Sequence, residues 1–242
     1  MLRRAPLLAA LLTACAGPGG GRGTPISGET ITLSGGHGHP EADFRERPLM
    51  GFVVPPSPQE AGVIGAGRMS PATQATHGRI GADGRWTLTL PALGPASLQP
   101  MRRVENLPDG CALLEDTLRP EDAQFADLVL AAKLPHQETA PHEPGTPPGF
   151  ERLISQRTAV PSPGTTQTEE LQLRFVDRDV LVHTVIRCET DEGLFEGEQT
   201  LNLKAGWNLV QAVTTHDAGK RVQKQSLQVM PLSTRLPLTS TH

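Results

Sequence analysis

Alternating apolar and polar residues dominate the last third of the chain. Leu171, Leu173 and Phe175, for example, are separated by polar residues. This period of two is typical of half-buried strands, and short turns separate the successive runs. We therefore predict five consecutive strands that form an antiparallel β-meander over residues 168–235. The apolar runs cover residues 171–175, 180–188, 200–204, 207–213 and 222–230.

Strand patterns are shorter in the first half of the chain. The clearest is residues 85–91, in which Trp86, Leu88 and Leu90 share one face before Pro91 ends the strand. An Asp-Gly turn at Asp83 precedes it. Weaker signals predict further strands, and together they indicate a β-sandwich-like half over residues 28–133. The weaker strands are expected at residues 29–34, 51–54, 78–81 and 126–132.

Two other segments are predicted to lack strands. Pro120 and the acidic residues after it favour one helical turn at residues 119–124. Residues 134–167 contain seven prolines, and we interpret them as an inter-domain linker or a long loop.

The segment from Gly78 to Pro91 resembles part of a known family. A glycine-containing strand, the Asp-Gly turn and the Arg85–Pro91 strand are similar to the small β-sandwich modules of the carboxypeptidase-regulatory or transthyretin-like kind. The resemblance spans about residues 28–91 and implies a fold, not an activity. With the strand patterns, it predicts an all-β protein, either one antiparallel β-sandwich or two sandwich-like halves.

The first fifteen residues have the layout of an export signal. Arg3 and Arg4 precede a short apolar run, which ends in Leu12-Thr13-Ala14-Cys15. This ending resembles the lipobox of bacterial lipoproteins. The resemblance implies a signal peptide over residues 1–14, cleavage before Cys15 and acyl chains, such as palmitate, on Cys15. Residues 15–27 are rich in glycine and are expected to be a flexible tether. The alternative is an ordinary signal peptide with an incidental cysteine.

Composition narrows the range of partners. The chain has 22 basic and 26 acidic residues, and without Arg3 and Arg4 the remaining chain has a net charge of −6. No basic stripe is present, so we expect no nucleic-acid partner. The same charge disfavours electrostatic docking on anionic lipid, so the membrane would be held through the lipid anchor, with the protein facing the periplasm or the exterior.

The two remaining cysteines, Cys111 and Cys188, form an even pair in a chain predicted to reach an oxidising compartment. We predict a disulfide between them, worth on the order of 4 kcal/mol if unstrained. Two buried free thiols are the alternative. In residues 180–188, Cys188 belongs to the apolar face, whereas His183 and Arg187 belong to the other face.

Evidence for catalytic or metal chemistry is weak. His37 and His39 form a His-x-His pair that could bind a divalent metal if a further ligand converged on it, although a solvated loop is the commoner interpretation. No Gly-x-Ser-x-Gly, His-Glu-x-x-His or Walker-type motif occurs in the sequence. Residues 62–70 resemble the opening of a dinucleotide-binding unit, but Pro71 follows directly and no strand pattern precedes them, so a glycine-rich β turn is the better interpretation. We expect no cofactor and no recognisable catalytic residue.

These observations favour a lipid-anchored protein of the bacterial cell envelope. We expect it to act as a non-enzymatic binding or structural module, with another envelope protein or a small ligand as its partner. The alternative is an envelope hydrolase whose active site the sequence does not reveal.

Overall fold

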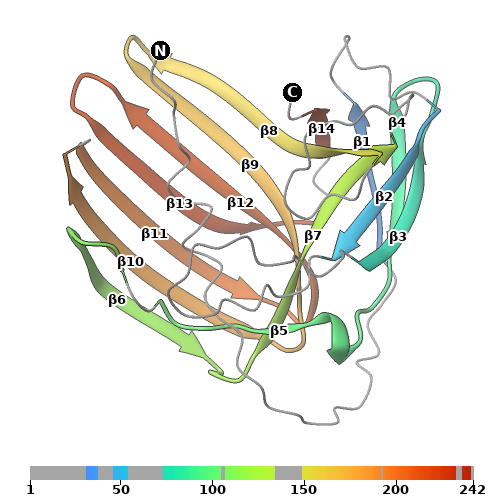
Figure 1. Cartoon of the computed structure of the whole chain (residues 1–242), viewed down its shortest axis with the longest axis horizontal. Helices are drawn as coiled ribbons and strands as arrows, with labels where there is room; N and C mark the ends of the chain where they lie inside the picture. Colours follow the sequence, from blue (N-terminus) through green and yellow to red (C-terminus); the bar gives the residue numbers. More distant parts are fainter. Residues whose placement is uncertain are drawn as a thin grey trace.

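A computed structural model describes residues 31–37, 46–53, 73–104, 107–133, 149–191, 193–232 and 236–240. About three quarters of these residues lie in β-strands (Figure 1), and the described part contains no α-helix, only a single 3₁₀ turn, η1, at Pro95–Ser97. The prediction of an all-β, mostly antiparallel protein is confirmed.

Fourteen strands of the described part form one hydrogen-bonded sheet, in the order β5-β7-β2-β3-β4-β1-β14-β8-β9-β12-β13-β11-β10-β6. They are β1 (Ile31–His37), β2 (Pro48–Val53), β3 (Thr73–Ile80), β4 (Arg85–Leu90), β5 (Gln99–Pro100), β6 (Cys111–Arg119), β7 (Gln124–Lys133), β8 (Phe150–Ser162), β9 (Thr165–Val176), β10 (Val180–Thr190), β11 (Gly193–Leu203), β12 (Gly206–Asp217), β13 (Val222–Met230) and β14 (Leu236–Ser240).

Strand β7 joins two parts of this sheet. One of its edges pairs with β2, and the other pairs with β9 near the start of β7 and with β8 near its end. Strands β1 to β4 and β14 make up a small region. The long strands β8 to β13, together with β6, make up what we call the large sheet, and Figure 1 shows them side by side.

The large sheet is not the simple meander that the sequence predicted. Strand β12 pairs with β9, and the β12–β13 hairpin then lies between β9 and β11. Strands β13 and β11 run parallel. The alternation of residues identified the strands, but it carries no information on which strand pairs with which.

The proline-rich segment is not entirely a linker or loop. Residues 150–162 form β8, the longest strand, which continues through a turn at Gly164 into β9. The strand contains one proline, Pro161, which is tolerated because the pairing of β8 with β9 is irregular between Ala159 and Ser162. The first part of β8 pairs with β7 and β14, and its second part pairs with β9.

The predicted helical turn at residues 119–124 is also wrong. A cis peptide bond joins Arg119 to Pro120, and the chain turns there from β6 into β7. The strand then begins at Gln124, two residues earlier than predicted. Acidic residues after a proline favour a helix only locally, and the pairing of β7 with β5 and β9 determines the outcome.

Two apolar clusters cover opposite faces of the large sheet near β7. Trp207, Leu209, Leu173 and Phe175 point to one face and pack with the core of the small region. Val210 and its neighbours point to the other face, where they pack with Leu118, Phe125 and other apolar residues. We call these the Trp207 face and the Val210 face.

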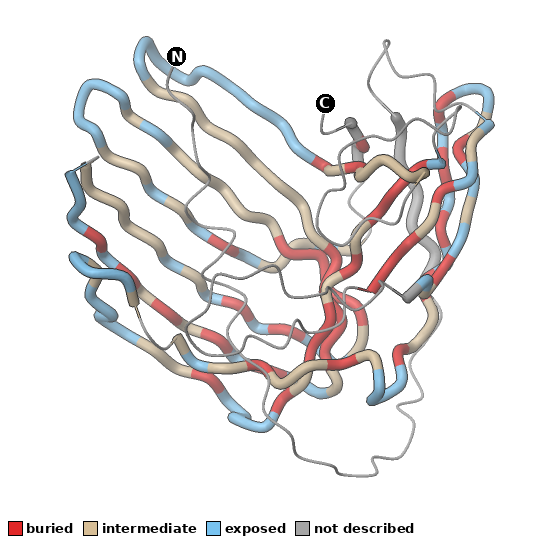
Figure 2. Tube along the Cα trace, viewed as in Figure 1, coloured by how far each residue is buried: buried red, intermediate tan, exposed pale blue. Residues whose placement is uncertain are grey.

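The apolar packing on the two faces of the large sheet decreases away from β7. Figure 2 shows that buried residues concentrate at the junction, whereas the far ends of β9, β11, β12 and β13 are half-buried or exposed. We call this far part, made of residues 165–170, 193–199, 213–217 and 222–226, the free end of the sheet. Residues on both faces are half-buried or exposed here and most are polar, so neither face carries a thick apolar core.

Candidate ligand-binding groove

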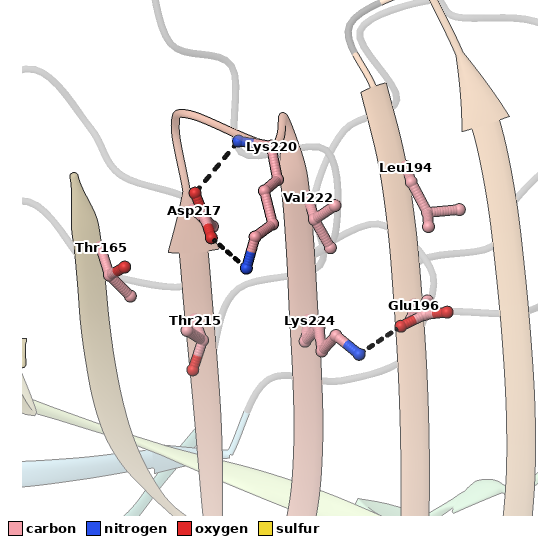
Figure 3. A pocket seen from close by; sticks show the side chains of 8 residues that line it. All are labelled: Thr165, Leu194, Glu196, Thr215, Asp217, Lys220, Val222 and Lys224. Atoms are coloured by element: carbon pink, nitrogen blue, oxygen red, sulfur yellow. Dashed lines mark hydrogen bonds and ion pairs between the residues drawn. The ribbon is translucent and has the colours of Figure 1, made fainter. Parts of the chain in front are cut away.

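A hollow of about 380 Å³ lies on the Trp207 face at the free end of the sheet (Figure 3). It spans four neighbouring strands, β9, β12, β13 and β11, and the turn between β12 and β13. We call it the groove. Its lining residues are Thr165, Leu194, Glu196, Thr215, Asp217, Lys220, Val222 and Lys224.

Strand register brings these residues together. Asp217 lies opposite Thr165 on one side and opposite Val222 on the other, and Val222 lies opposite Leu194. One row deeper, Lys224 lies between Thr215 and Glu196. Directly opposed residues point to the same face of a sheet, so residues from three separate hairpins line one surface.

The first ion pair of the groove forms within the β12–β13 turn. One oxygen of Asp217 accepts a hydrogen bond from the backbone N–H of Lys220, and the other lies 3.3 Å from Lys220 Nζ. The backbone hydrogen bond, followed by the contacts with the lysine side chain, lowers the pKa of Asp217. The carboxylate is therefore ionised at neutral pH.

The second ion pair crosses from β13 to β11. Lys224 Nζ lies 2.7 Å from Glu196 Oε2. The hydrogen bond from Lys224, helped by its charge, lowers the pKa of Glu196. Two lysines and two carboxylates thus surround the apolar side chains of Leu194 and Val222, and the groove carries no net charge.

Several contacts hold the free end in one arrangement. Leu194 N–H donates to the carbonyl of Arg221, which fixes the start of β11 against the β12–β13 turn. Gly193 adopts a φ of +135° at this point, where a side chain would meet the carbonyl of Arg221. On the Val210 face, Cys188 of β10 lies opposite Phe195 of β11 and is covalently joined to β6.

The predicted disulfide is present. Cys111 and Cys188 lie directly opposite each other on β6 and β10, with an S–S distance of 2.06 Å. Cys188 is buried and points to the apolar side of β10, as its alternation with Val182 and Ile186 predicted.

The other predicted site residues are not tested. Cys15 and His39 lie outside the described residues, as do the leader and the tether. His37 is the last residue of β1 and lies opposite Leu238 of β14. Within the described segments, no group of three or more His, Cys, Asp or Glu side chains is placed to hold a metal ion.

One arrangement of polar side chains was not foreseen. His183 Nδ1 lies 3.0 Å from Thr200 Oγ1, and His183 Nε2 lies 2.9 Å from Glu115 Oε2. The alternation had placed His183 on the face opposite to Cys188, but nothing in the sequence linked it to β6 and β11. Glu115 is 64% exposed, so water reaches this group of side chains.

The groove residues were also missed. Glu196 and Lys224 belong to two hairpins, and they meet only because β11 and β13 pair in parallel. The sequence offers no signal for this pairing, whereas the turn at residues 216–220 could be recognised from its composition.

No protein-family model, curated protein or solved structure matches this chain. Among the described residues, no helix has the length and apolar character needed to span a membrane.

Proposed function

We propose that this protein is a lipid-anchored component of the bacterial cell envelope and that the groove is its binding site. The likeness of Leu12–Cys15 to a lipobox supports the anchor, and the glycine-rich tether would separate the folded part from the membrane. The observation that carries the binding role is the groove itself. It is a formed surface hollow, lined by charged and apolar side chains, at a free end that lacks a thick core.

The lining favours a ligand that carries both signs of charge. Lys220 and Lys224 can donate to a carboxylate, Glu196 and Asp217 can accept from an ammonium or guanidinium group, and Leu194 offers apolar contact. A polyanion would meet two carboxylates as well as two lysines. A polar segment of another envelope protein, or a small zwitterion, fits this chemistry best.

The anchor is tested by the intact mass of the protein purified from native membranes. A mass equal to residues 15–242 plus acyl groups supports the proposal. A mature chain that begins elsewhere and carries no lipid would refute the anchor, and the protein would then be secreted without one.

The groove is tested by photo-crosslinking in cells. A crosslinking amino acid replaces Thr215, which lines the groove, or the neighbouring Thr214, which points to the opposite face of β12. We expect a discrete adduct from position 215 only, and we expect Lys224→Glu to abolish it. Equal labelling from both positions, or labelling that Lys224→Glu leaves unchanged, would rule out the groove as the binding site.

A hydrolase remains the second candidate, and the contacts of His183 favour it. The Thr200 hydroxyl contacts the His183 imidazole, which in turn contacts the Glu115 carboxylate. Such a chain of contacts can activate the hydroxyl as a nucleophile. If this group is catalytic, the protein hydrolyses an activated ester, and both His183→Ala and Thr200→Val abolish the reaction. A wild-type rate equal to that of the two variants would eliminate this candidate.

A further inference from the structure

Strand β6 ends the large sheet. Its inner edge pairs with β10, and no other described strand pairs with it. Figure 1 shows β6 at the border of the sheet, on the side away from β9 and β12. An edge strand of this kind presents unpaired backbone groups to which a further strand can bind.

The disulfide makes this edge a firm template. Cys111 at the start of β6 is bonded to Cys188 of β10, and at the other end Leu118 is buried against the apolar cluster of the Val210 face. The strand is therefore held at both ends. It can accept a partner without first becoming ordered, which lowers the entropic cost of association.

An irregularity divides β6 into two parts. The register with β10 shifts between Val185 and Ile186, which leaves Leu114 as an extra residue on β6. Such a bulge disrupts regular pairing, so only the following run, Glu115–Arg119, offers an even edge. Leu114 is 58% exposed at the start of this run.

The charges on the regular run are self-complementary. Glu115 and Arg119 are at its two ends, Thr117 is at its centre, and all three point to the Trp207 face because they alternate along one strand. If a second copy of β6 pairs antiparallel about a two-fold axis at Thr117, Glu115 of each copy lies opposite Arg119 of the other. The dimer then gains two cross-strand ion pairs.

Other registers about a two-fold axis are less favourable. With the axis at Asp116, the Asp116 carboxylates of the two copies lie opposite each other. An axis at Glu115 or at Arg119 likewise places two like charges opposite each other. Like charges directly opposite each other on paired strands are destabilising. The remaining polar side chain of the run, Asp116, points to the Val210 face and already accepts a hydrogen bond from Thr184.

We propose that the protein forms a homodimer in which the β6 strands of two copies pair antiparallel about Thr117, which joins the two large sheets into one. The two-fold axis leaves each groove accessible, because the groove begins at β11, beyond β10. A dimer would therefore present two grooves on the same face of a continuous sheet.

The first test uses charge reversal in the full-length chain, with Cys15→Ser to remove the third thiol. Analytical ultracentrifugation of the wild type should show a reversible monomer–dimer equilibrium. Glu115→Arg and Arg119→Glu should each weaken dimerisation about tenfold or more, and the double variant should restore it, because the opposed charges are again unlike. Circular dichroism confirms that each variant is folded.

The second test is a crosslink. Thr117→Cys should give a disulfide-linked dimer under mild oxidation, because residues opposite each other at the axis lie about 4.5–5.5 Å apart. Leu114→Cys is the control. That position is well exposed, but three residues from the axis the two thiols would be about 20 Å apart.

Three outcomes would overturn the proposal: a wild type that stays monomeric at every concentration, a double variant no better than the single variants, or a Leu114→Cys crosslink as efficient as that of Thr117→Cys. A monomer that nevertheless binds an extended segment of another protein along β6 would show that the edge serves a different partner.

Discussion

Asp127 and Arg174 lie directly opposite each other on β7 and β9 and are joined by two hydrogen bonds, of 2.7 and 2.9 Å. The guanidinium group is buried and lies 4.9 Å from the centre of the Phe125 ring. Burial lowers the pKa of Arg174, but the Asp127 carboxylate more than offsets this, and the pKa is raised overall. A charged pair therefore links the strand of the junction to the large sheet.

We predict that Asp127→Ala lowers the free energy of unfolding by about 3 kcal/mol, because it leaves the buried Arg174 charge without a partner. Urea denaturation measures the change. Asp122→Ala is the matched control, since it removes the exposed pair with Arg178, and it should cost less than about 1 kcal/mol. Equal effects of the two substitutions would contradict the role of the buried pair.

Removing the Cys111–Cys188 bond should cost about 4 kcal/mol, because it frees the unfolded chain from a cross-link between residues 77 positions apart. The double variant Cys111→Ser and Cys188→Ser should unfold at a lower urea concentration than the wild type. Reductant should shift the wild type to the same midpoint and leave the variant unchanged. If the reductant breaks the bond in the wild type but leaves the urea midpoint unchanged, the stabilising role is refuted.

The two tryptophans should respond differently to replacement by phenylalanine. Trp207 Nε1 donates a 2.8 Å hydrogen bond to the carbonyl of Pro91, whereas the buried Nε1 of Trp86 has no acceptor in the described part of the chain. Both changes remove part of a buried ring, but only Trp207→Phe also removes a hydrogen bond. We expect Trp207→Phe to be more destabilising by about 1 kcal/mol in thermal or urea unfolding. Equal losses would refute this difference.

The groove should lose its ion pairs in acid. The pKa values of Asp217 and Glu196 are lowered in the folded protein from ordinary values of 3.8 and 4.5. Their contribution to stability is present above these ordinary values and is lost as the pH falls through the lower folded-state values. Carboxyl-carbon NMR titration should therefore show both midpoints below the ordinary ones.

Lys224→Met provides the control for this titration. It should return the midpoint of Glu196 toward 4.5, because the hydrogen bond from Lys224 is the main cause of the shift, and leave that of Asp217 unchanged. If Lys224→Met moves the titration midpoints of both Glu196 and Asp217, the two ion pairs are not independent.

The sequence predicted the strands better than their arrangement. Alternation located Trp86, Leu88 and Leu90 on one buried face, and it correctly separated Cys188 from His183, because the side-chain period of a strand is a local property. The pairing partners depend on contacts between distant segments. For this reason the sequence did not predict that β11 pairs in parallel with β13 or that β8 pairs with three different strands. The groove residues Glu196 and Lys224 were missed for the same reason.

Strand β14, the last described strand, affects the order of folding. It pairs in parallel with β1, at Gly35 to His37, and antiparallel with β8, so the first and last strands of the described chain are neighbours. A chain still emerging from the ribosome lacks β14, so one edge of β1 and one edge of the first part of β8 are then unpaired. Pairing of these edges can therefore be completed only after β14 has been synthesised, more than 190 residues after β1, and such long-range pairings form slowly.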